Sequence, residues 1–341
     1  MDQYVGLDVS MEETSICVLD HNGTVMFEGS APSRPVAIAK LLRHRAPSAI
    51  RIAFESGALS SWLWHELKAM AFPVVCLDAR HAHAALSMRM NKSDRNDARG
   101  LAELVRMGWY REARVKSMES RQIRAVLAAR AKLVDLRRDL ENQMRGLLKS
   151  LGIILGKVGP RIMLGKIAAV LRQAPHLRPI INPLMLAHSA LVTQILKYDE
   201  QVRALSEADP TVQRLMTVPG VGPVTALAFV STIDDPKRFA HACDVGAYLG
   251  LTPRRYQSGE LDRTGRISKR GDCLMRKYLF EAANVLLTVV RRPSPLKAWG
   301  VKLAKRIGFK KAKVAIARKL ATILHCIWTD GTEFQWAKAG A

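Results

Sequence analysis

Strand-like and helix-like segments alternate through the first eighty residues, and this alternation narrows the possible folds more than any other feature of the chain. Apolar stretches of about four to eight residues predict strands, and longer stretches with a three-to-four-residue period predict helices. An Asn22-Gly23 pair is typical of a tight hairpin turn. The predicted order is strand, strand, strand, helix, strand, helix and strand, over residues 4–10, 15–20, 24–29, 35–44, 49–56, 61–70 and 73–79.

This order is that of a ribonuclease H-like α/β domain, in which helices flank a mixed sheet. A further helix is predicted from about 93 to 107, because Ser93 is a suitable N-cap and Ala98, Leu101 and Val105 share one apolar stripe. We therefore expect a first domain over residues 1–112.

Residues 113–207 are expected to form a helical coiled-coil region. Between about 115 and 151, apolar residues recur mainly at intervals of three and four, which makes a seam for a partner helix. The seam residues are Val126, Leu133, Leu136, Leu140, Met144, Leu147 and Leu151. Prolines at 160, 175, 179 and 183 predict several shorter helices, followed by a return helix from about 184 to 207. We expect the chain to form oligomers through the long helix.

Residues 208–341 are expected to form a mostly helical domain. The predicted fold class is α/β plus all-α, with a mixed-sheet N-terminal domain, a helical coiled-coil linker and a helical C-terminal domain. With 48% hydrophobic residues and a mean hydropathy of −0.01, the chain has ample apolar material for folded cores. Wholesale disorder is therefore not expected.

Positive charge is concentrated in the last two thirds of the chain. The net charge is +23, yet residues 1–110 contain 12 basic and 12 acidic residues. Residues 251–320 contain 19 basic and 4 acidic residues, a net of +15. Because the surplus is local, it favours binding to a polyanion, with nucleic acid as the expected partner, over a generally basic surface. A membrane surface is disfavoured, since no helix joins this charge to a bulky aromatic face.

The sequence indicates neither a membrane segment nor a secretory leader. No apolar run approaches the roughly 18 to 20 residues that a membrane helix needs, and MDQYVGLDVS lacks the basic start of a leader. The five cysteines are far apart, without metal-ligand spacing, so we expect neither disulfides nor zinc and expect the thiols to be buried. The expected location is the cytoplasm.

Four carboxylates in the first domain are candidates for a metal site. Asp8 lies within the first apolar strand and Glu55 ends the fourth, and these strands are neighbours in the proposed sheet. Asp94 and Asp97, at i and i+3, share one face of the helix that would cross the same edge. Four converging oxygen donors would repel one another without divalent cations, so we expect a two-metal magnesium site that activates a phosphodiester. The alternative for each residue alone is an N-cap, a surface position or an isolated strand position.

The segment VPGVGP (218–223), followed by an apolar helix, is typical of a helix-hairpin-helix motif. Gly220 and Gly222 would let the backbone approach a phosphate, and the next helix would present its N-terminal amides. The alternative is a tight turn used only for packing.

Residues 250–272 form a predicted basic loop, with Ser258 at its centre. The candidate nucleic-acid-binding residues of the loop are Arg254, Arg255, Tyr256, Arg263, Arg266, Lys269 and Arg270. By pattern alone Ser258 is an ordinary turn residue, and no nearby His offers the general base that serine nucleophiles often use.

Together these motifs resemble those of transposases of the insertion-sequence 110 family, which are related to the Piv-type invertases. The resemblance covers nearly the whole chain, although it is loose between residues 151 and 200. It rests on GLDVS, FESG, KSDRNDA and VPGVGPVTA, and above all on GAYLGLTPRRYQSG leading to GRISKRGD.

The resemblance implies an RNA-guided DNA recombinase. A RuvC-like nuclease domain would bind magnesium through Asp8, Glu55, Asp94 and Asp97, and Ser258 in the transposase domain would attack the scissile phosphodiester. The resemblance also implies a homo-oligomer, a dimer or tetramer, whose composite active site combines residues of different protomers. The implied partners are donor and target DNA and a non-coding bridge RNA, and the implied place of action is the bacterial nucleoid.

Two other functions stay open on the residues alone. A metal-dependent junction-resolving endonuclease would share the acidic set but use water as its nucleophile, with no use for Ser258. A non-catalytic RNA-binding or DNA-binding chaperone would need neither the carboxylates nor the serine.

Overall fold

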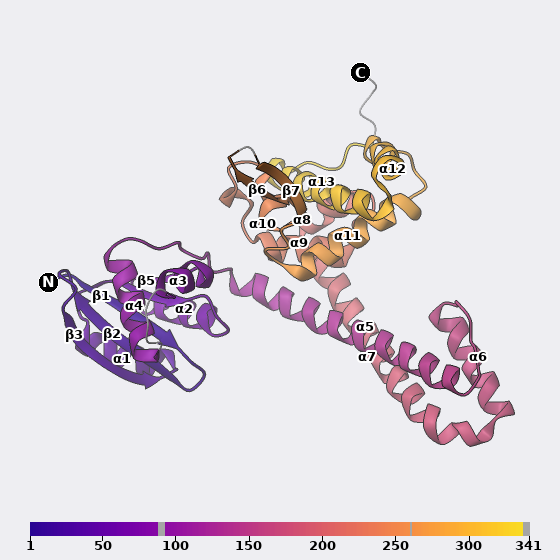
Figure 1. Cartoon of the computed structure of the whole chain (residues 1–341), viewed down its shortest axis with the longest axis horizontal. Coiled ribbons are helices and arrows are strands. Elements are labelled where there is room, and N and C mark those ends of the chain that lie inside the picture. Colours follow the sequence, from indigo (N-terminus) through magenta and orange to yellow (C-terminus); the bar gives the residue numbers. More distant parts are fainter. Residues whose placement is uncertain (88–92, 260, 337–341) are drawn as a thin grey trace. The chain divides into compact units, whose positions relative to one another are not determined.

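The computed structural model describes residues 1–87, 93–259 and 261–336 and divides into two compact units, Met1–Lys116 and Ser117–Ala341. The first is a sheet with helices, and the second is mostly helical (Figure 1). Lys92 of the KSDRNDA motif and Glu260 of the basic segment lie outside the described residues. The division into three domains at residues 112 and 207 stays a prediction.

A five-stranded mixed sheet forms the centre of the first unit. Its strands are β1 (Gln3–Val9), β2 (Glu13–Asp20), β3 (Val25–Pro32), β4 (Ala49–Glu55) and β5 (Val74–Leu77), in the order β3-β2-β1-β4-β5. The middle strand β1 pairs antiparallel with β2 and parallel with β4. The predicted succession of strands and helices, and the mixed sheet that follows from it, are confirmed.

Helices cover both faces of this sheet. On one face α1 (Pro35–Arg45) and α2 (Ser60–Ala69) pack against Leu7 and Phe54. On the other face α4 (Asp94–Arg106) packs against Cys17 and Ala53. The two faces are therefore both buried, which a parallel β1–β4–β5 arrangement requires.

The helix starts in this unit follow local capping. Ser93 caps α4 as the sequence predicts, its Oγ accepting from the backbone N–H of Asn96 at 3.3 Å. The short helix α3 (Ala79–Leu86) was not predicted. It begins because the Asp78 carboxylate accepts from the backbone N–H groups of Arg80 and His81.

In the second unit, α5 (Met118–Ser150) and α7 (Arg178–Ala208) form a long helical pair (Figure 1). They are joined through α6 (Pro160–Gln173) and a short 3-10 turn (Pro175–Leu177). The return helix begins at Arg178 rather than near residue 184, because Pro179 falls at its start, where no helical N–H bond is needed, and Pro183 is accommodated inside it.

The buried positions of α5 differ from the predicted seam. Met144 is fully buried, as expected, but Leu136 is exposed and Leu140 is only half-buried. In their place α5 buries Glu141, whose Oε1 lies 3.0 Å from Nε2 of His188 on α7. The buried carboxylate thus has a hydrogen-bonding partner, which the heptad-like pattern could not indicate.

The remainder of the second unit packs around a helical core. Its elements are α8 (Pro210–Met216), α9 (Pro223–Ile233), a 3-10 turn (Pro236–Arg238), α10 (Asp244–Tyr248), β6 (Pro253–Ser258), β7 (Leu261–Ile267), α11 (Cys273–Thr288), α12 (Pro295–Ile307) and α13 (Phe309–Asp330). Phe229 of α9, Leu279 of α11 and Leu320 of α13 are fully buried in this core. The mostly helical character predicted for this region is confirmed.

The basic segment 250–272 is not the expected irregular loop. Its strands β6 and β7 pair antiparallel as a hairpin, and Gly259, with φ +57°, provides a left-handed turn residue between them. The strands escaped prediction because they consist largely of charged and polar residues, without an apolar face that alternates.

By length and composition alone, the described stretch Pro175–Ala208 could cross a membrane, although no such run was expected from the sequence. One such helix is weak evidence. This one packs along α5, and its Asp199 Oδ1 accepts from Nε of Arg130 on α5 at 2.6 Å.

All five cysteines are free thiols. Cys17 and Cys76 are buried as expected, but the prediction of burial is wrong for Cys243, Cys273 and Cys326, which are exposed. Burial, with the nearby Glu28 carboxylate, raises the pKa of the Cys17 thiol to about 12, so this cysteine stays protonated and unreactive.

Candidate functional site

Asp8 and Glu55 occupy adjacent positions on the parallel strands β1 and β4. The register pairs Leu7 with Phe54, so the next residues, Asp8 and Glu55, follow side by side toward the carboxyl ends of their strands. Side chains alternate along a strand, and Ala53 faces α4, so Glu55 lies on the α4 face too. Both carboxylates are half-buried. The prediction that these two strands are neighbours in the sheet is confirmed.

The helix α4 lies directly on β1 at Gly6. A Cβ on Gly6 would come within 1.9 Å of the carbonyl oxygen of Ala98, so only glycine permits this approach. Two residues earlier on β1, Tyr4 packs in a cluster with Val105, further along the helix. The helix therefore runs opposite to β1, and its first turn extends toward the strand end that carries Asp8.

Asp94 and Asp97 belong to that first turn. They precede Ala98 and Leu101 by one helical turn each, and both of these residues are buried against the sheet. Asp94 is exposed and Asp97 is half-buried. Acidic residues in a first turn also stabilise a helix through its dipole, so the position of this pair fits a role in stabilising the start of α4 as well.

The four carboxylates thus come from three adjacent elements, but their side chains are not gathered into a ligand cluster. Within the residues that the structure describes, no three His, Cys, Asp or Glu side chains are arranged to hold a metal ion. The chemistry of the set still fits magnesium, which prefers carboxylate oxygens to His or Cys ligands.

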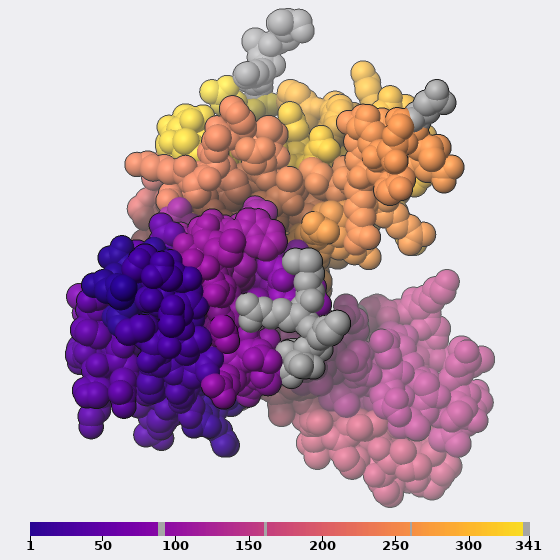
Figure 2. Space-filling model, turned by 60° about the vertical axis from the view of Figure 1, so that its left-hand side comes forward, coloured from indigo at the N-terminus to yellow at the C-terminus, as the bar shows by residue number. Residues whose placement is uncertain are grey.

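Ser258 is the last residue of β6, at the tip of the hairpin. It pairs with Leu261, and Tyr256 pairs with Arg263. Because side chains alternate along each strand, Ser258, Tyr256 and Arg263 share one face of the hairpin. Every described side chain of β6 is exposed, and the orange segment projects from the surface in Figure 2. The serine hydroxyl is therefore accessible.

The opposite face of the hairpin carries an ion pair. Arg255 donates from Nε and Nη2 to the two carboxylate oxygens of Asp262, at 2.8 and 2.7 Å. The Arg255 hydrogen bond lowers the pKa of Asp262. The remaining basic residues predicted to bind nucleic acid are all exposed, on the hairpin or just after it: Arg254, Arg263, Arg266, Lys269 and Arg270.

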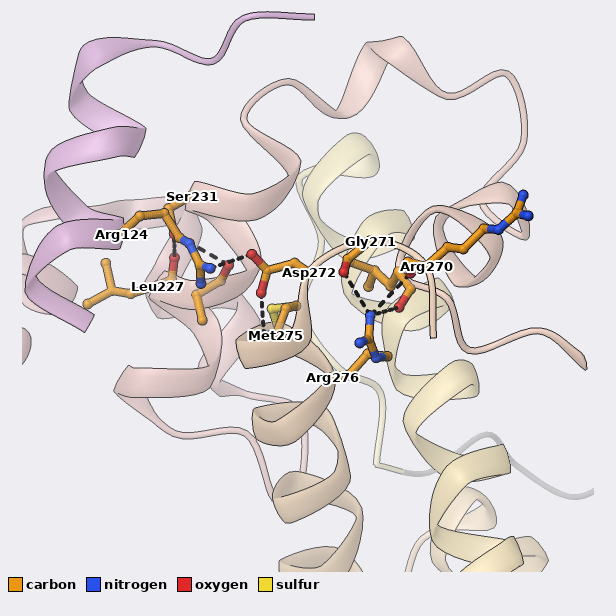
Figure 3. Close-up of polar contacts among 10 residues, drawn as sticks. Arg124, Leu227, Ser231, Arg270, Gly271, Asp272, Met275 and Arg276 are labelled. Atoms are coloured by element: carbon orange, nitrogen blue, oxygen red, sulfur yellow. Dashed lines mark hydrogen bonds and ion pairs between the residues drawn. The ribbon is translucent and has the colours of Figure 1, made fainter. Parts of the chain in front are cut away.

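One arginine holds both ends of the hairpin (Figure 3). Arg276 of α11 donates from Nη1 to the carbonyl oxygens of Leu249, Arg270 and Gly271, at 3.2, 3.1 and 3.0 Å. Leu249 precedes β6, whereas the other two follow β7. Gly250 makes this closure possible, since a Cβ there would lie 1.9 Å from the carbonyl oxygen of Arg270. Sequence reasoning missed Arg276, and the only signal for it was an arginine one helical turn after the basic segment.

The two glycines of VPGVGP have different surroundings. Gly220, with φ +88°, faces α11, where an added Cβ would lie 2.4 Å from the carbonyl oxygen of Ala282. Packing alone therefore requires Gly220. Gly222 has open space at its Cβ position and is the N-cap of α9. A helix, a turn and a second helix are present, and phosphate binding by this segment stays a prediction.

Comparisons with known proteins agree with this arrangement. A transposase family model, that of the IS110 DEDD type, matches residues 5–153, and the model "Transposase IS116/IS110/IS902 family" matches residues 212–298. The chain is 28% identical to the transposase of IS1111A from Coxiella burnetii, over 95% of this chain and 89% of that protein.

Two further relatives support the same class. A probable family 20 transposase of Pseudomonas aeruginosa is 30% identical, over 71% of this chain and 73% of its own length. The pilin gene-inverting protein of Moraxella bovis is 31% identical, over 41% of this chain and 45% of its own length. The fold and these matches define a transposase, an enzyme class that cuts and transfers DNA strands. The chain belongs to the IS110/IS116/IS902 family.

Proposed function

We propose that this transposase cuts and rejoins DNA with Ser258 as its nucleophile, assisted by a divalent metal at Asp8, Glu55, Asp94 and Asp97 in a RuvC-like domain. The observation that supports the metal site is the contact of α4 with β1 at Gly6, which directs the first turn of α4 toward the strand ends bearing the other two carboxylates. The observation that supports the serine is its exposed position at the tip of the hairpin. A water-using nuclease would need the same carboxylates but no exposed serine.

Magnesium is the metal that suits an all-carboxylate set. Asp8 and Glu55, from the sheet, and Asp94 and Asp97, from the helix, would hold it. When bound, such a cation supplies positive charge that polarises a phosphodiester. The half-buried positions of Asp8 and Glu55 would limit the access of water to the metal. The exposed position of Asp94 would let a nucleic-acid strand approach the metal from that side.

In the proposed reaction, Oγ of Ser258 loses its proton and attacks the phosphorus atom of a DNA strand. A phosphoserine bond forms, the bond to the 3′ oxygen breaks, and the released 3′ oxygen takes up a proton. A new 3′ hydroxyl then reverses the attack, which joins the strands without ATP. Arg263 and Tyr256, on the same hairpin face as Ser258, would contact the phosphate and the flanking base.

The test of this mechanism is Ser258→Ala, assayed on DNA that flanks the gene, with Thr264→Ala as a matched control. Thr264 lies on the same hairpin and is also exposed, but it is on the other face. We expect Ser258→Ala to abolish both strand cutting and the covalent protein–DNA adduct, and the control to keep both. Undiminished cutting by Ser258→Ala would favour the junction-resolving nuclease.

Nucleic acid is the proposed partner of α12 and α13 as well as of the hairpin. Between residues 282 and 329 the chain has 11 basic residues and no acidic ones. Trp299 on α12 and Phe309 at the start of α13 are 41% and 45% exposed, and exposed rings beside cations suit unpaired bases. We propose that a bridge RNA is one of the bound strands. Sequencing the RNA that co-purifies with the protein tests this, because a discrete RNA from beside the gene is expected.

A second copy of the chain is the proposed occupant of a groove along α5 and α7. The groove has a volume of about 560 Å³. Its lining residues are Leu136, Asp139, Leu140, Gln143, Ala187, Ala190, Leu191 and Gln194. Two leucines expected in a helical seam thus line an open apolar surface, and an oligomer would bring acidic and serine residues of different copies into one composite site.

Sedimentation tests the oligomer. Leu136→Glu would place a charge in the groove and is expected to give monomers. The matched control is Leu186→Glu, since Leu186 is an exposed leucine of α7 that does not line the groove. Wild-type protein that sediments only as a monomer, with and without nucleic acid, would contradict the composite site.

A further inference from the structure

The hairpin that carries Ser258 has almost no packing of its own. All described side chains of β6 are exposed, and on β7 only Ile267 is half-buried. Side-chain burial therefore cannot fix the direction in which the hairpin projects. That direction is set where the hairpin leaves the helical core, at the residues around 249–252 and 268–272.

Backbone hydrogen bonds close this base, and the Arg276 guanidinium binds both of its ends. The N–H of Ser268 donates to the Thr252 carbonyl oxygen at 2.8 Å, and that of Lys269 donates to the Gly250 carbonyl oxygen at 3.1 Å. Arg276 adds three hydrogen bonds to the carbonyl oxygens of Leu249, Arg270 and Gly271. Arg276 lies in the first turns of α11, so the base of the hairpin is fixed to that helix.

Asp272 connects the same base to α5. Its Oδ1 caps α11 by accepting from the N–H of Met275 at 2.7 Å. Its Oδ2 accepts from Nη2 of Arg124, on α5 (Figure 3). The side chains of Arg124 and Asp272 are only 23% and 18% exposed, so this ion pair is shielded from solvent far more than a surface pair.

A second ion pair joins the same two helices further along. Nζ of Lys277 on α11 donates to Oδ1 of Asp135 on α5 at 3.0 Å. The helix α5 is thus bound to α11 at two points about three helical turns apart along α5. It also carries Leu136 and Leu140, which line the open groove. One helix therefore connects the groove to the base of the serine hairpin.

We propose that Arg276, Asp272 and Arg124 are positioning residues that fix the direction of the Ser258 hairpin relative to α5. This inference rests on the proposed role of Ser258. The serine is then oriented by α5, which also lines the groove. A second copy of the chain bound in the groove would therefore contact the helix to which the base of the serine hairpin is fixed. The two ends of this connection lie within one compact unit.

The experiment separates the ion pair from the helix cap. Asp272→Asn keeps a side-chain oxygen that can cap α11 but removes the charge that Arg124 binds. Arg124→Gln removes the other partner, and the double variant completes a cycle. Arg130→Gln is the matched control, because Arg130 is similarly buried on α5 but pairs with Asp199 of α7 rather than with a residue at the base of the hairpin.

Full-length variants are assayed on a plasmid that carries the DNA flanking the gene, with the flanking RNA co-expressed. We expect Asp272→Asn and Arg124→Gln to lower kcat for strand cutting by about tenfold to a hundredfold, with the DNA concentration at half-maximal rate within about twofold. Their Tm values should match that of Arg130→Gln. The double variant should be no worse than either single one, since both break the same pair.

Arg276→Lys tests the clamp at the base of the hairpin. Lysine keeps the charge but cannot span the three carbonyl groups as a guanidinium does, so we expect a loss of kcat without a matching loss of DNA affinity. Faster trypsin cleavage within 254–270 should accompany it. If Arg276→Lys does not fold, the kcat values of the Asp272 and Arg124 variants still test whether these residues position the hairpin.

The inference is overturned if Asp272→Asn and Arg124→Gln cut DNA as well as Arg130→Gln does, or lose activity only in proportion to stability. Inactivity of Ser258→Ala in the same assay would then leave the proposed function intact. Full activity of Ser258→Ala would instead remove the proposed function itself, whatever the other variants do.

Discussion

The four carboxylates and the serine are held in opposite ways. Asp8 and Glu55 extend from strands buried on both faces, and α4 is pressed onto the sheet at Gly6. Ser258 stands at the tip of a hairpin whose strands have no buried side chain, and the base of the hairpin is fixed by Arg276 and by backbone hydrogen bonds. The backbone of the acidic set is thus ordered by the hydrophobic core, whereas the serine depends on contacts at the base of its hairpin, where Leu249 and Leu251 are buried. We infer that perturbation of the core should affect the two parts unequally.

Removal of divalent metal should have the largest effect. We expect chelation with EDTA to abolish strand cutting, because the carboxylates would repel one another and a phosphodiester without the cation. Binding to nucleic acid should largely persist, since the net positive charge of the chain comes entirely from residues after position 110. Gel-shift and cleavage assays on the same samples measure the difference, and cutting that survives chelation would contradict the metal site.

Gly6→Ala should come next. The new Cβ would lie 1.9 Å from the Ala98 carbonyl oxygen, so α4 must move away from β1, at a cost of at least about 1 to 3 kcal/mol. We expect a lower Tm for the first unit and loss of cutting. Gly57→Ala is the control, since nothing lies within 4 Å of its Cβ position, and equal stability of both variants would show that the contact is not required.

Substitutions on the serine face of the hairpin should have a moderate effect on binding. We expect Arg263→Gln and Tyr256→Ala to weaken the affinity for DNA by about tenfold each without changing Tm, because both side chains are exposed. The slope of log affinity against log salt should fall by about 0.7 to 0.9 for Arg263→Gln only. Lys40→Gln, an exposed lysine of α1, is the control and should leave both affinity and slope unchanged.

The smallest effect concerns pH. A hydrogen bond from Lys277 lowers the pKa of Asp135, so the stabilisation from this pair is complete above the ordinary aspartate pKa of about 3.9 and is lost as pH falls through the lowered value. The Tm difference between wild type and Lys277→Gln should therefore be constant from about pH 6 to 8 and shrink toward pH 3. A difference that grows as pH falls would contradict this sign.

Sequence reasoning succeeded where burial dictates pattern. The succession of strands and helices and the helix beginning after Ser93 follow from apolar periodicity and capping. The neighbouring positions of Asp8 and Glu55 follow from the sheet topology proposed for that succession. It failed where side chains are exposed or polar groups are buried. The charged strands of the hairpin have no apolar alternation, and the buried Glu141 is paired with His188 of α7 as well as with Arg137 of its own helix. The clamp of Arg276 depends on a tertiary contact that no local pattern contains.

The exposed hairpin also allows nucleic-acid binding to be followed by proteolysis of the protein itself. Four of its arginines, Arg254, Arg255, Arg263 and Arg266, lie on exposed strands, so their peptide bonds are the natural targets of trypsin in the free protein. A bound strand would shield them. The order in which these bonds become protected, as DNA and RNA are added in turn, would give a footprint read from the protein side, without labelling either nucleic acid.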